Sequence, residues 1–385
     1  MNESFSALGV SAPVVRALSR RGIEAPFAVQ TLVLPDALGG VDVLAASPTG
    51  SGKTLAFGIP VIERTAPGAG KPSALVLVPT RELATQVVEE LAPLAAARSL
   101  RIAAVYGGTS VQAQAKSARG ADVLVATPGR MNDLIERRMV SLRGVRVLVL
   151  DEADRMLDMG FRPQVDRILR DVPANRQTLL FSATLQGPVM GLAKTYTANA
   201  VHVRAERPAE RAPGTIAHEF VAVTFDGKIE RLAKTIEEAD GLSLVFVRTK
   251  HGADKLARKL QRLHNVRAVV MHGNMSQNAR ERSLAQFESG KVQTLVATDV
   301  AARGLDVDDV THVINFDPPQ SDEDYVHRTG RTGRAGRSGT GVTFVLPDQR
   351  NDVGNLARRL GHEGAFAASG MATATRPARK RGRRR

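Results

Sequence analysis

The chain has 385 residues, 43% of them apolar, and carries a formal net charge of +14 at pH 7. This length exceeds one ordinary hydrophobic core and indicates two domains of roughly 150–200 residues each. The chain contains no cysteine, which excludes disulfides and thiolate metal sites, and no apolar stretch long enough to span a bilayer. We therefore expect a soluble, cytoplasmic protein.

The positive charge favours a polyanionic partner, most simply nucleic acid. The last ten residues, 376–385, hold seven positive and no negative charges, and we expect residues 371–385 to form a disordered tail that contacts nucleic acid. For the rest of the chain, the alternative is that the basic balance serves only solubility. Aromatic residues make up 4% of the sequence and tryptophan is absent. Sequence-independent contacts to the sugar-phosphate backbone are therefore favoured over base stacking.

Short apolar runs alternate with amphipathic stretches along the chain. The runs expected to be buried parallel strands are Leu75–Val78, Val123–Val125, Val145–Leu150, Thr178–Phe181, Leu244–Val247, Thr294–Val296 and Val313–Phe316. Helical patterns such as Arg81–Leu94 and Asp254–Leu263 lie between them. This alternation is typical of an α/β architecture with parallel sheets.

An internal repeat suggests that the two halves fold alike. The sequence LVLVPTRELATQVVEEL begins at Leu75, and LVFVRTKHGADKLARKL begins at Leu244; LVAT occurs at 124–127 and again at 295–298. A third apolar run ends in Asp151 and its counterpart in Asp317, so three matches keep an offset of 166–171 residues. We expect an N-terminal segment (1–32), a first domain (33–204), a proline-bearing linker (205–213) and a second domain (214–370).

The first chemical motif is SPTGSGKT at residues 47–54, between an apolar segment and a helical pattern. Glycines let backbone N–H groups converge on a phosphate, and the following helix adds its positive end. We expect Lys53 to reach the β- and γ-phosphates and the Thr54 hydroxyl to bind magnesium. Ser47 stands where the GxxxxGK[ST] pattern has glycine, but the strand–loop–helix context favours a phosphate loop over a chance glycine-rich turn.

An acidic pair, Asp151 and Glu152, directly follows a buried strand, at the carboxyl end where α/β proteins form their sites. Asp151 is expected to hold magnesium, largely through its water shell, and Glu152 to orient or deprotonate the attacking water. Ser182 and Thr184 follow another strand, and their hydroxyls are candidates to hydrogen-bond Asp154. The alternative, a plain surface turn, is disfavoured by the accompanying phosphate loop.

The second half has neither motif, but residues 327–337 read HRTGRTGRAGR, with arginine every three residues. Guanidinium groups stabilise the charge on a transferring phosphoryl group. We therefore expect the second domain to complete a site that the first begins. The alternative is a second basic patch for nucleic acid.

Together these motifs resemble those of the DEAD-box RNA helicases of superfamily 2, over about residues 5–348. In chain order, the stretches that resemble family motifs are 22–30 (GIEAPFAVQ, the Q motif), 47–54, 79–84 (PTRELA), 107–108 (GG), 127–130 (TPGR), 151–154 (DEAD), 182–184 (SAT), 245–249 (motif IV), Gln277 with Arg280 (QxxR), 297–306 (ATDVAARGLD, motif V) and 327–334 (motif VI). Small departures are Ser47 for alanine, Arg248 for asparagine and Thr329 for isoleucine. The resemblance implies two tandem RecA-like domains, each a parallel sheet flanked by helices, with ATP and Mg²⁺ as cofactors and RNA as partner.

The resemblance also implies roles for individual residues. Those implied for catalysis are Lys53, Asp151, Glu152, Arg331 and Arg334. Those implied for ATP binding are Phe5, Gln30, Ser47, Pro48, Thr49, Gly50, Ser51, Gly52, Lys53, Thr54 and Asp306, with Thr54 and Asp151 at the metal. Those implied for coupling are Asp154, Ser182, Thr184 and His327. Those implied for RNA binding are Pro79, Thr80, Arg81, Gly108, Thr127, Pro128, Gly129, Arg130, Arg248, Thr249, Gln277, Arg280, Thr298 and Arg303.

The expected activity is RNA-stimulated ATP hydrolysis coupled to closure of the two domains, with local unwinding of short RNA duplexes and remodelling of RNA and its protein complexes. The resemblance implies the bending of RNA and the local opening, whereas the spacing of the motifs indicates only a split site. The alternatives are an ATP-dependent RNA clamp, an RNA-annealing protein without processive unwinding and, least favoured, a DNA helicase. The sequence does not indicate which RNA or pathway is served.

Overall fold

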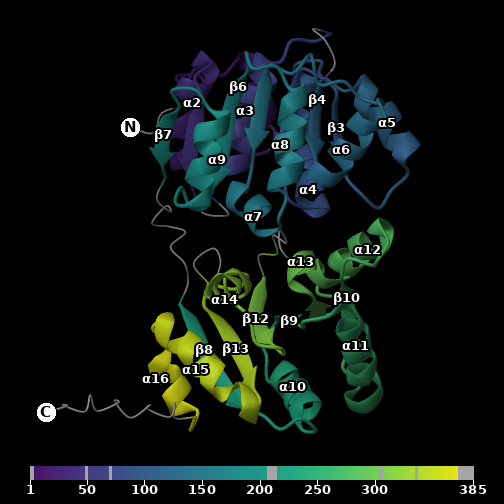
Figure 1. Ribbon diagram of the computed structural model, residues 1–385, viewed down its shortest axis with the longest axis vertical. Coiled ribbons are helices and arrows are strands. Elements are labelled where there is room, and N and C mark those ends of the chain that lie inside the picture. Colours follow the sequence, from purple (N-terminus) through teal and green to yellow (C-terminus); the bar gives the residue numbers. More distant parts are fainter. Residues whose placement is uncertain are drawn as a thin grey trace, which may run out of the picture. The chain divides into compact units, whose positions relative to one another are not determined.

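The computed structural model describes residues 4–47, 51–68, 72–205, 215–302, 307, 309–333 and 337–371. The chain divides into two compact units, Met1–Ala209 and Glu210–Arg385 (Figure 1). Apart from Ala205, the expected linker lies outside the described residues, and so does the basic tail from residue 372 onward.

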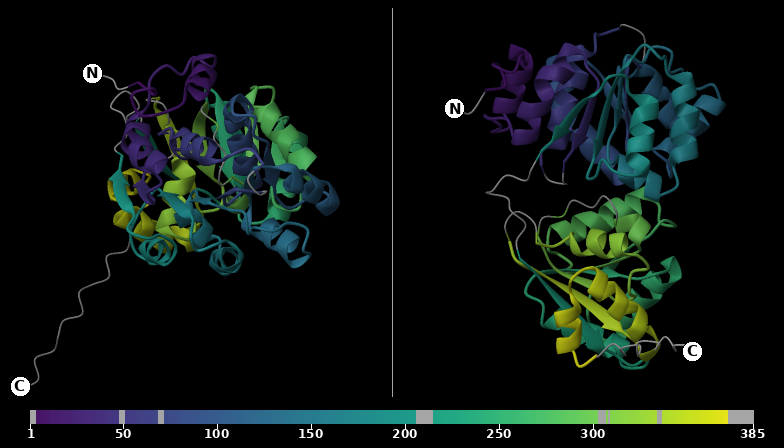
Figure 2. Two further views of the ribbon diagram at one scale, coloured as in Figure 1. Left: turned by 90° about the horizontal axis from the view of Figure 1, so that it is seen from above. Right: turned by 60° about the vertical axis from the view of Figure 1, so that its left-hand side comes forward.

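Within the described residues, unit 1 contains one seven-stranded sheet in which every neighbouring pair is parallel. In spatial order its strands are β3 (Ile102–Val105), β4 (Val123–Ala126), β2 (Ala74–Leu77), β5 (Val147–Leu150), β6 (Gln177–Ser182), β1 (Val43–Ala46) and β7 (Val201–Arg204). Its helices are α1 (Ala12–Ser19), α2 (Ala28–Gly39), α3 (Lys53–Arg64), α4 (Arg81–Ala97), α5 (Val111–Gly120), α6 (Pro128–Glu136), α7 (Ala153–Asp158), α8 (Arg162–Asp171) and α9 (Pro188–Tyr196). The N-terminal helices, purple in Figure 2, pack on this unit.

The central strands of unit 1 are apolar along their whole length because both faces of the sheet are covered. In β2, Ala74 and Val76 face one core cluster, while Leu75 and Leu77 face the other. All four side chains are fully buried. The result is a rigid sheet between two helical layers, from whose edge the loops project.

Unit 2 contains, among its described residues, one six-stranded sheet that is also parallel throughout. In spatial order its strands are β10 (Ala268–Met271), β11 (Thr294–Ala297), β9 (Leu242–Phe246), β12 (Val310–Asn315), β13 (Gly339–Val345) and β8 (Ile216–Ala222). Its helices are α10 (Lys228–Glu237), α11 (Lys250–His264), α12 (Gln277–Glu288), α13 (Asp299–Ala302), α14 (Asp322–Thr329), the 3₁₀ turn η2 (Pro347–Gln349), α15 (Arg350–Arg359) and α16 (Glu363–Ala368). No described helix in either unit is long and apolar enough to cross a membrane.

The two sheets share one topology, which confirms the prediction of two similarly folded α/β parts. The order β3-β4-β2-β5-β6-β1 in unit 1 corresponds strand by strand to β10-β11-β9-β12-β13-β8 in unit 2. The repeated sequences lie at equivalent places, and even their helix caps agree. The Thr80 hydroxyl accepts a hydrogen bond from the Leu83 N–H at the start of α4, and the Thr249 hydroxyl accepts one from the Gly252 N–H at the start of α11.

A close approach between α3 and α4 yields a stability prediction. A Cβ atom added at Gly58 would overlap Cδ2 of Leu91, which is fully buried. Gly58→Ala is therefore expected to destabilise the fold by about 1–3 kcal/mol through overpacking. Gly191→Ala is the matched control, because Gly191 also lies inside a helix but has no atom within 4 Å of the added Cβ. The control should be neutral or stabilising by up to about 1 kcal/mol. Urea unfolding of both variants tests the contact, and equal stabilities would contradict it.

Candidate functional site

Most residues singled out from the sequence lie on one edge of each sheet, where the parallel strands end. In unit 1 the ends of β5, β6 and β1, which we call the phosphate half, lead into Asp151, Ser182 and Ser47. The ends of β2, β4 and β3, which we call the backbone half, lead into the loops 78–80, 127 and 106–110. These strands are neighbours in one sheet, so the two halves adjoin along a single edge, the usual place for ligands in open α/β sheets.

The phosphate loop is held to the end of the sheet by buried serines. The Ser47 N–H donates to the Ser182 carbonyl oxygen at 2.9 Å, and the Ser47 and Ser51 hydroxyls lie 2.5 Å apart. Ser47 therefore has a structural role that alanine lacks. Lys53 is buried, and Lys53 and Thr54 form the first turn of α3, whose free N–H groups suit an anion. Pro48, Thr49 and Gly50 lie outside the described residues.

Gly52 joins this loop to the region of the expected Q motif. Its φ is +90°, and an added Cβ would lie 2.5 Å from Phe27 and 2.7 Å from Gln30. Gln30 is buried; its amide donates to the Gly52 carbonyl oxygen at 3.0 Å and accepts from the Phe27 N–H at 2.9 Å. Each end of the amide retains one further hydrogen-bonding position for a ligand. Phe5, by contrast, is 2% exposed within the hydrophobic core, so its ring is not open to a ligand in this structure.

Asp151 is a buried carboxyl group with an unfavourable charge environment. Its pKa is raised to about 7, chiefly by burial and in addition by the Glu152 and Asp154 carboxylates, while the Lys53 ammonium and the Glu152 N–H oppose the shift. A bound divalent cation would offset this accumulation of negative charge. No cluster of three potential ligands from His, Cys, Asp or Glu occurs among the described residues. Magnesium commonly takes one or two carboxylates and completes its shell with water and phosphate oxygens, so the buried Asp151 carboxyl group is a suitable donor.

Glu152 adopts a backbone conformation that few non-glycine residues take. Its φ and ψ are both 51°, the left-handed region, at the step from β5 to α7. Such a conformation costs of order 1–3 kcal/mol and is concentrated at functional sites. Its side chain accepts a hydrogen bond at 2.5 Å from Arg155, which lies one turn along and is itself buried. The backbone and the ion pair together fix the direction of the Glu152 carboxylate.

Asp154 does contact the segment after β6, but not in the expected way. Its Oδ2 accepts a hydrogen bond from the Ala183 backbone N–H at 3.1 Å, and its Oδ1 accepts one from the Arg155 N–H. Among the described residues, neither the Ser182 nor the Thr184 hydroxyl bonds it. The Ser182 hydroxyl instead accepts from the Thr184 N–H at 3.3 Å, because Ser182 is fully buried at the end of the strand. The expectation of a hydroxyl contact is therefore wrong, although the two segments are joined.

In the backbone half, the expected RNA residues fall into two groups. Arg81 lies against the glycine pair at 107–108, since a Cβ added at Gly108 would overlap the Arg81 guanidinium. Gly108 also has a φ of +90°. Thr80 and Thr127 are largely buried and precede α4 and α6, while Pro128 and Gly129 form the first turn of α6. This arrangement exposes backbone N–H groups at two helix starts on one edge, where phosphates bind readily.

The Arg130 guanidinium is held by neighbouring groups of the backbone half. Its guanidinium donates to the Gln114 side chain at 2.8 Å and to the Thr109 carbonyl oxygen at 3.1 Å, and lies 3.6 Å from Asp133. Its side chain is 9% exposed. These contacts position the glycine-pair loop, and the expected RNA contact of Arg130 stays a prediction.

In unit 2 the residues expected to bind RNA follow the strands that correspond to β2, β4 and β3 of unit 1. Thr249, Thr298 and the Gln277–Arg280 pair follow β9, β11 and β10, the counterparts of β2, β4 and β3. Arg248 and Thr249 are exposed, as a ligand requires. Thr298, Gln277 and Arg280 are buried, and Arg280 donates to the carbonyl oxygens of His272 (3.3 Å) and Ala301 (3.5 Å). Arg280 therefore holds neighbouring loops together in this structure, while the Gln277 amide donates to Glu281 on its own helix.

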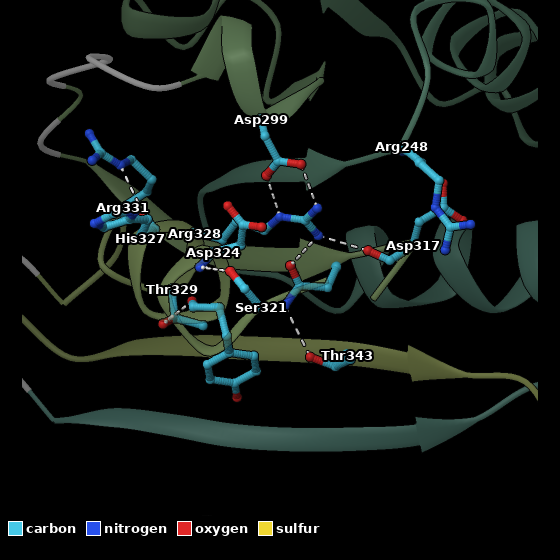
Figure 3. A network of polar contacts seen from close by, with 12 residues as sticks. Arg248, Asp299, Asp317, Ser321, Asp324, His327, Arg328, Thr329, Arg331 and Thr343 are labelled. Atoms are coloured by element: carbon cyan, nitrogen blue, oxygen red, sulfur yellow. Dashed lines mark hydrogen bonds and ion pairs between the residues drawn. The ribbon is translucent and has the colours of Figure 1, made fainter. Parts of the chain in front are cut away.

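Arg328 was not expected to have a role of its own, yet its guanidinium bonds several segments of this edge (Figure 3). Its guanidinium forms a bidentate pair with Asp299 at 2.5 and 2.7 Å and also donates to the Asn315 side chain at 3.0 Å and the Asp317 carbonyl oxygen at 2.7 Å. It is 4% exposed and lies over the Phe246 ring. Arg328 thus connects the segments after β9, β11 and β12. Its place within the arginine repeat was the signal that could have identified it.

Asp317 extends this network toward the exposed loop after β9. One carboxylate oxygen accepts from the Arg248 backbone N–H at 2.9 Å, and the other pairs with the buried Lys228 ammonium at 2.8 Å. Lys228 also lies 4.0 Å over the Phe316 ring. Asp317 occupies the position in unit 2 that Asp151 occupies in unit 1, so the repeated aspartate fixes a loop in unit 2.

Of the arginines expected to stabilise phosphoryl charge, Arg331 is described and is 9% exposed, with Nε donating to the His327 carbonyl oxygen at 3.3 Å. His327 and Arg331 lie on and just after α14, on the same segment as Arg328 (Figure 3). Arg303, Asp306 and Arg334 lie outside the described residues.

Comparison with known proteins agrees with this arrangement. The family model described as DEAD/DEAH box helicase matches residues 27–191, and that described as helicase conserved C-terminal domain matches residues 227–336. The chain is 42% identical to the DEAD-box ATP-dependent RNA helicase CshA of Geobacillus kaustophilus, over 92% of this chain and 76% of that protein. It is 43% identical to the ATP-dependent RNA helicase CshA of Listeria monocytogenes over 89% of this chain, but spans only 66% of that relative's length.

Solved structures show the same fold. The S. cerevisiae protein Dbp5 bound to RNA and ADP BeF3 is 29% identical, with a TM-score of 0.81 over 93% of this chain and 94% of that one. The DEAD-box helicase Mss116 bound to ssRNA and UDP-BeF is 26% identical, with a TM-score of 0.80 over 93% and 78% of the two chains. The expected fold class of two RecA-like parts is confirmed. On the sequence identity, the two family matches and the shared fold, this chain belongs to the DEAD-box family of ATP-dependent RNA helicases.

Proposed function

We propose that the protein is an RNA-stimulated ATPase that couples closure of its two units to local opening of short RNA duplexes and to remodelling of RNA–protein complexes. The observation that carries the proposal is the adjacency of the phosphate half and the backbone half on one edge of unit 1. The relatives named as ATP-dependent RNA helicases support the same activity here.

In unit 1, Lys53 and the first turn of α3 bind the β- and γ-phosphates, and Gln30 reads the adenine. Thr54 and Asp151 hold magnesium, which supplies neutralisation of the phosphate charge. Glu152 orients the attacking water and accepts its proton; the left-handed backbone and the Arg155 contact support this role because both fix the carboxylate. Ser47, Ser51 and the residues between them complete the phosphate loop.

Unit 2 supplies what unit 1 lacks. Arg331 and Arg334 stabilise the charge on the transferring phosphoryl group, and Asp306 bonds the ribose. Hydrolysis then depends on closure, because the nucleophile's base and the arginines belong to different units. The network centred on Arg328 supports coupling, since it fixes the RNA-facing loop of Arg248 and the segment of Arg331 relative to each other.

RNA is bound along the backbone halves of both units. Arg81 with Gly108 and the starts of α4 and α6 contact phosphates in unit 1, and Arg248 with Thr249 contacts them in unit 2. The contacts are to backbone groups, so binding is independent of base sequence. A single RNA strand that is bound in a bent path across the backbone halves of the two units cannot stay paired with its complementary strand. Binding therefore opens the duplex locally.

The direct test is ATP hydrolysis measured with RNA and with DNA of the same sequence, while release of a short labelled strand is followed in parallel. We expect RNA to stimulate hydrolysis and DNA to stimulate it far less, because only RNA offers 2′-hydroxyls. Lys53→Ala should abolish both signals by weakening ATP binding. Hydrolysis without strand release would favour an RNA clamp, and hydrolysis indifferent to RNA would refute the proposal.

A further inference from the structure

The surface of α11 carries a charge pattern that the site does not explain. The helix reads KHGADKLARKLQRLH and contains five Lys or Arg residues but a single carboxylate, Asp254. Ala253, Leu256 and Leu260 face the core. The opposite side presents an exposed row at spacings of three and four, which we call the basic stripe: His251, Lys255, Arg258 and Arg262.

Within the described residues the charges of the stripe are not neutralised by the fold, although Arg258 Nε donates to the Asp254 carbonyl oxygen at 3.2 Å. The lone carboxylate of the helix, Asp254, contacts His272 at 3.0 Å, and no carboxylate among the described residues pairs with Lys255, Arg258 or Arg262. Exposed arginines on other helices do pair, as Arg167 of α8 does with Glu136. The helix dipole accounts for a cation in the last turn but not for those before it. Like charges one turn apart disfavour the helix, so the stripe opposes folding rather than supporting it.

The stripe begins at the edge already assigned to RNA and leads away from it along α11. Helix α11 begins directly after Arg248 and Thr249, and the Lys250 ammonium bonds the Asn274 side chain at 2.8 Å in the loop after β10. From there the helix runs beside β10, the edge strand of unit 2 (Figure 1). His251 to Arg262 spans about 16 Å at the rise of an α-helix. That is long enough to follow several phosphates of one nucleic-acid strand.

We propose that the basic stripe binds the phosphate backbone of RNA that extends beyond the segment held by Arg248 and Thr249. Phosphate is the ligand because the stripe is dominated by Lys and Arg, and α11 carries no Phe, Tyr or Trp on which a run of unpaired bases could stack. The inference rests on the proposed function, in that it needs RNA at the neighbouring loop. The extending RNA is either single-stranded or double-stranded, and the two forms share this chemistry.

The test compares two triple variants of the full chain. Lys255→Gln/Arg258→Gln/Arg262→Gln removes three charges of the stripe while keeping good helix formers. Lys194→Gln/Lys234→Gln/Arg350→Gln removes three exposed charges elsewhere and serves as the matched control. Affinity is measured against salt for three RNAs: a short single strand that fills only the core, the same strand with a single-stranded extension, and the same strand with a duplex extension.

The stripe variant is expected to bind an extended RNA at least about tenfold more weakly near 0.1 M salt. Its log–log salt slope should fall by about 2–3, at roughly 0.7 per lost contact to a single strand and 0.9 per lost contact to a duplex. The short strand and the control variant should show little change. Whichever extension shows the change identifies the form of RNA that is bound. A slope that is unchanged for both extensions, or that falls equally in the control, overturns the proposal.

Two further measurements distinguish failure of the stripe proposal from failure of the proposed function and from misfolding of a variant. ATP hydrolysis at saturating short RNA tests the proposed function alone: if the unsubstituted protein is not stimulated, that function fails whatever the stripe does. Circular dichroism detects a variant that does not fold. In that event the single variant Arg262→Gln replaces the triple one, and a slope change of about 1 supports the stripe while no change refutes it.

Discussion

The Glu152→Gln variant is expected to bind ATP and RNA as the unsubstituted protein does, but to hydrolyse ATP about 10²–10⁴ times more slowly. Glutamine has nearly the same shape and can still accept the hydrogen bond from Arg155, so the left-handed turn after β5 is preserved. It cannot accept a proton from water. The measurement is single-turnover hydrolysis with saturating RNA, with nucleotide and RNA affinities measured separately.

The control for this prediction is another glutamate paired with an arginine. Glu136 contacts Arg167 at 2.6 Å on the surface of unit 1, with both side chains more than half exposed. Exposed pairs of this kind contribute little to stability, and Glu136→Gln should leave turnover within about twofold of the original. If Glu152→Gln behaves like the control, Glu152 is not the base. If it loses ATP affinity instead, its role is electrostatic support of the metal site.

The fold was largely predictable from the sequence where strands are buried on both faces. The predicted runs coincide with β2, β4, β5, β6, β9, β11 and β12, although Val78, Val145, Arg146, Val247 and Phe316 lie just outside the strands. Of the four edge strands, β7 and β8 carry exposed polar side chains between their apolar ones and show no continuous apolar run. The other two, β3 and β10, are short apolar runs (IAAV and AVVM) that were not predicted as strands. Among the inner strands, β13 was not predicted because glycine and threonine interrupt the apolar residues of its sequence, GTGVTFV. Strand order was not predictable, because sequence repeats indicate similarity and not neighbours.

For the site, the sequence identified the chemical groups but not their backbone conformations or their hydrogen-bond partners within the fold. Asp151 and Lys53 were expected at the phosphate half and lie there. Nothing in the residue pattern indicated that Glu152 takes a left-handed conformation, or that Asp154 bonds a backbone N–H rather than a hydroxyl. The motif resemblance implied RNA contacts for Arg130 and Arg280, but it did not indicate that both side chains are largely buried and donate to carbonyl oxygens of neighbouring loops. These outcomes depend on tertiary distances, which motifs do not encode.

Arg331→Ala is expected to reduce RNA-stimulated ATP turnover by about 10³-fold or more, if its guanidinium stabilises the transferring phosphoryl group. Arg331→Lys should not restore the rate, because an ammonium cannot present the planar pair of donors. Arg337 provides the matched control: it lies on the same arginine-rich segment, but its side chain is 55% exposed and pairs with Asp309. Arg337→Ala should change turnover by no more than a few-fold.

The decisive comparison is between turnover and RNA affinity in the same Arg331 variant. A phosphoryl-stabilising arginine acts in the transition state, so its loss lowers turnover at saturating RNA and leaves RNA affinity nearly unchanged. An arginine of a nucleic-acid patch acts in binding, so its loss weakens RNA binding and lowers the salt slope, while turnover at saturation falls less than tenfold. Arg331 is 9% exposed and held to His327, a setting that suits a preorganised charge for one ligand position. Loss of turnover with unchanged RNA affinity would therefore support the split site predicted from the arginine repeat. Loss of RNA affinity with turnover largely kept would contradict it.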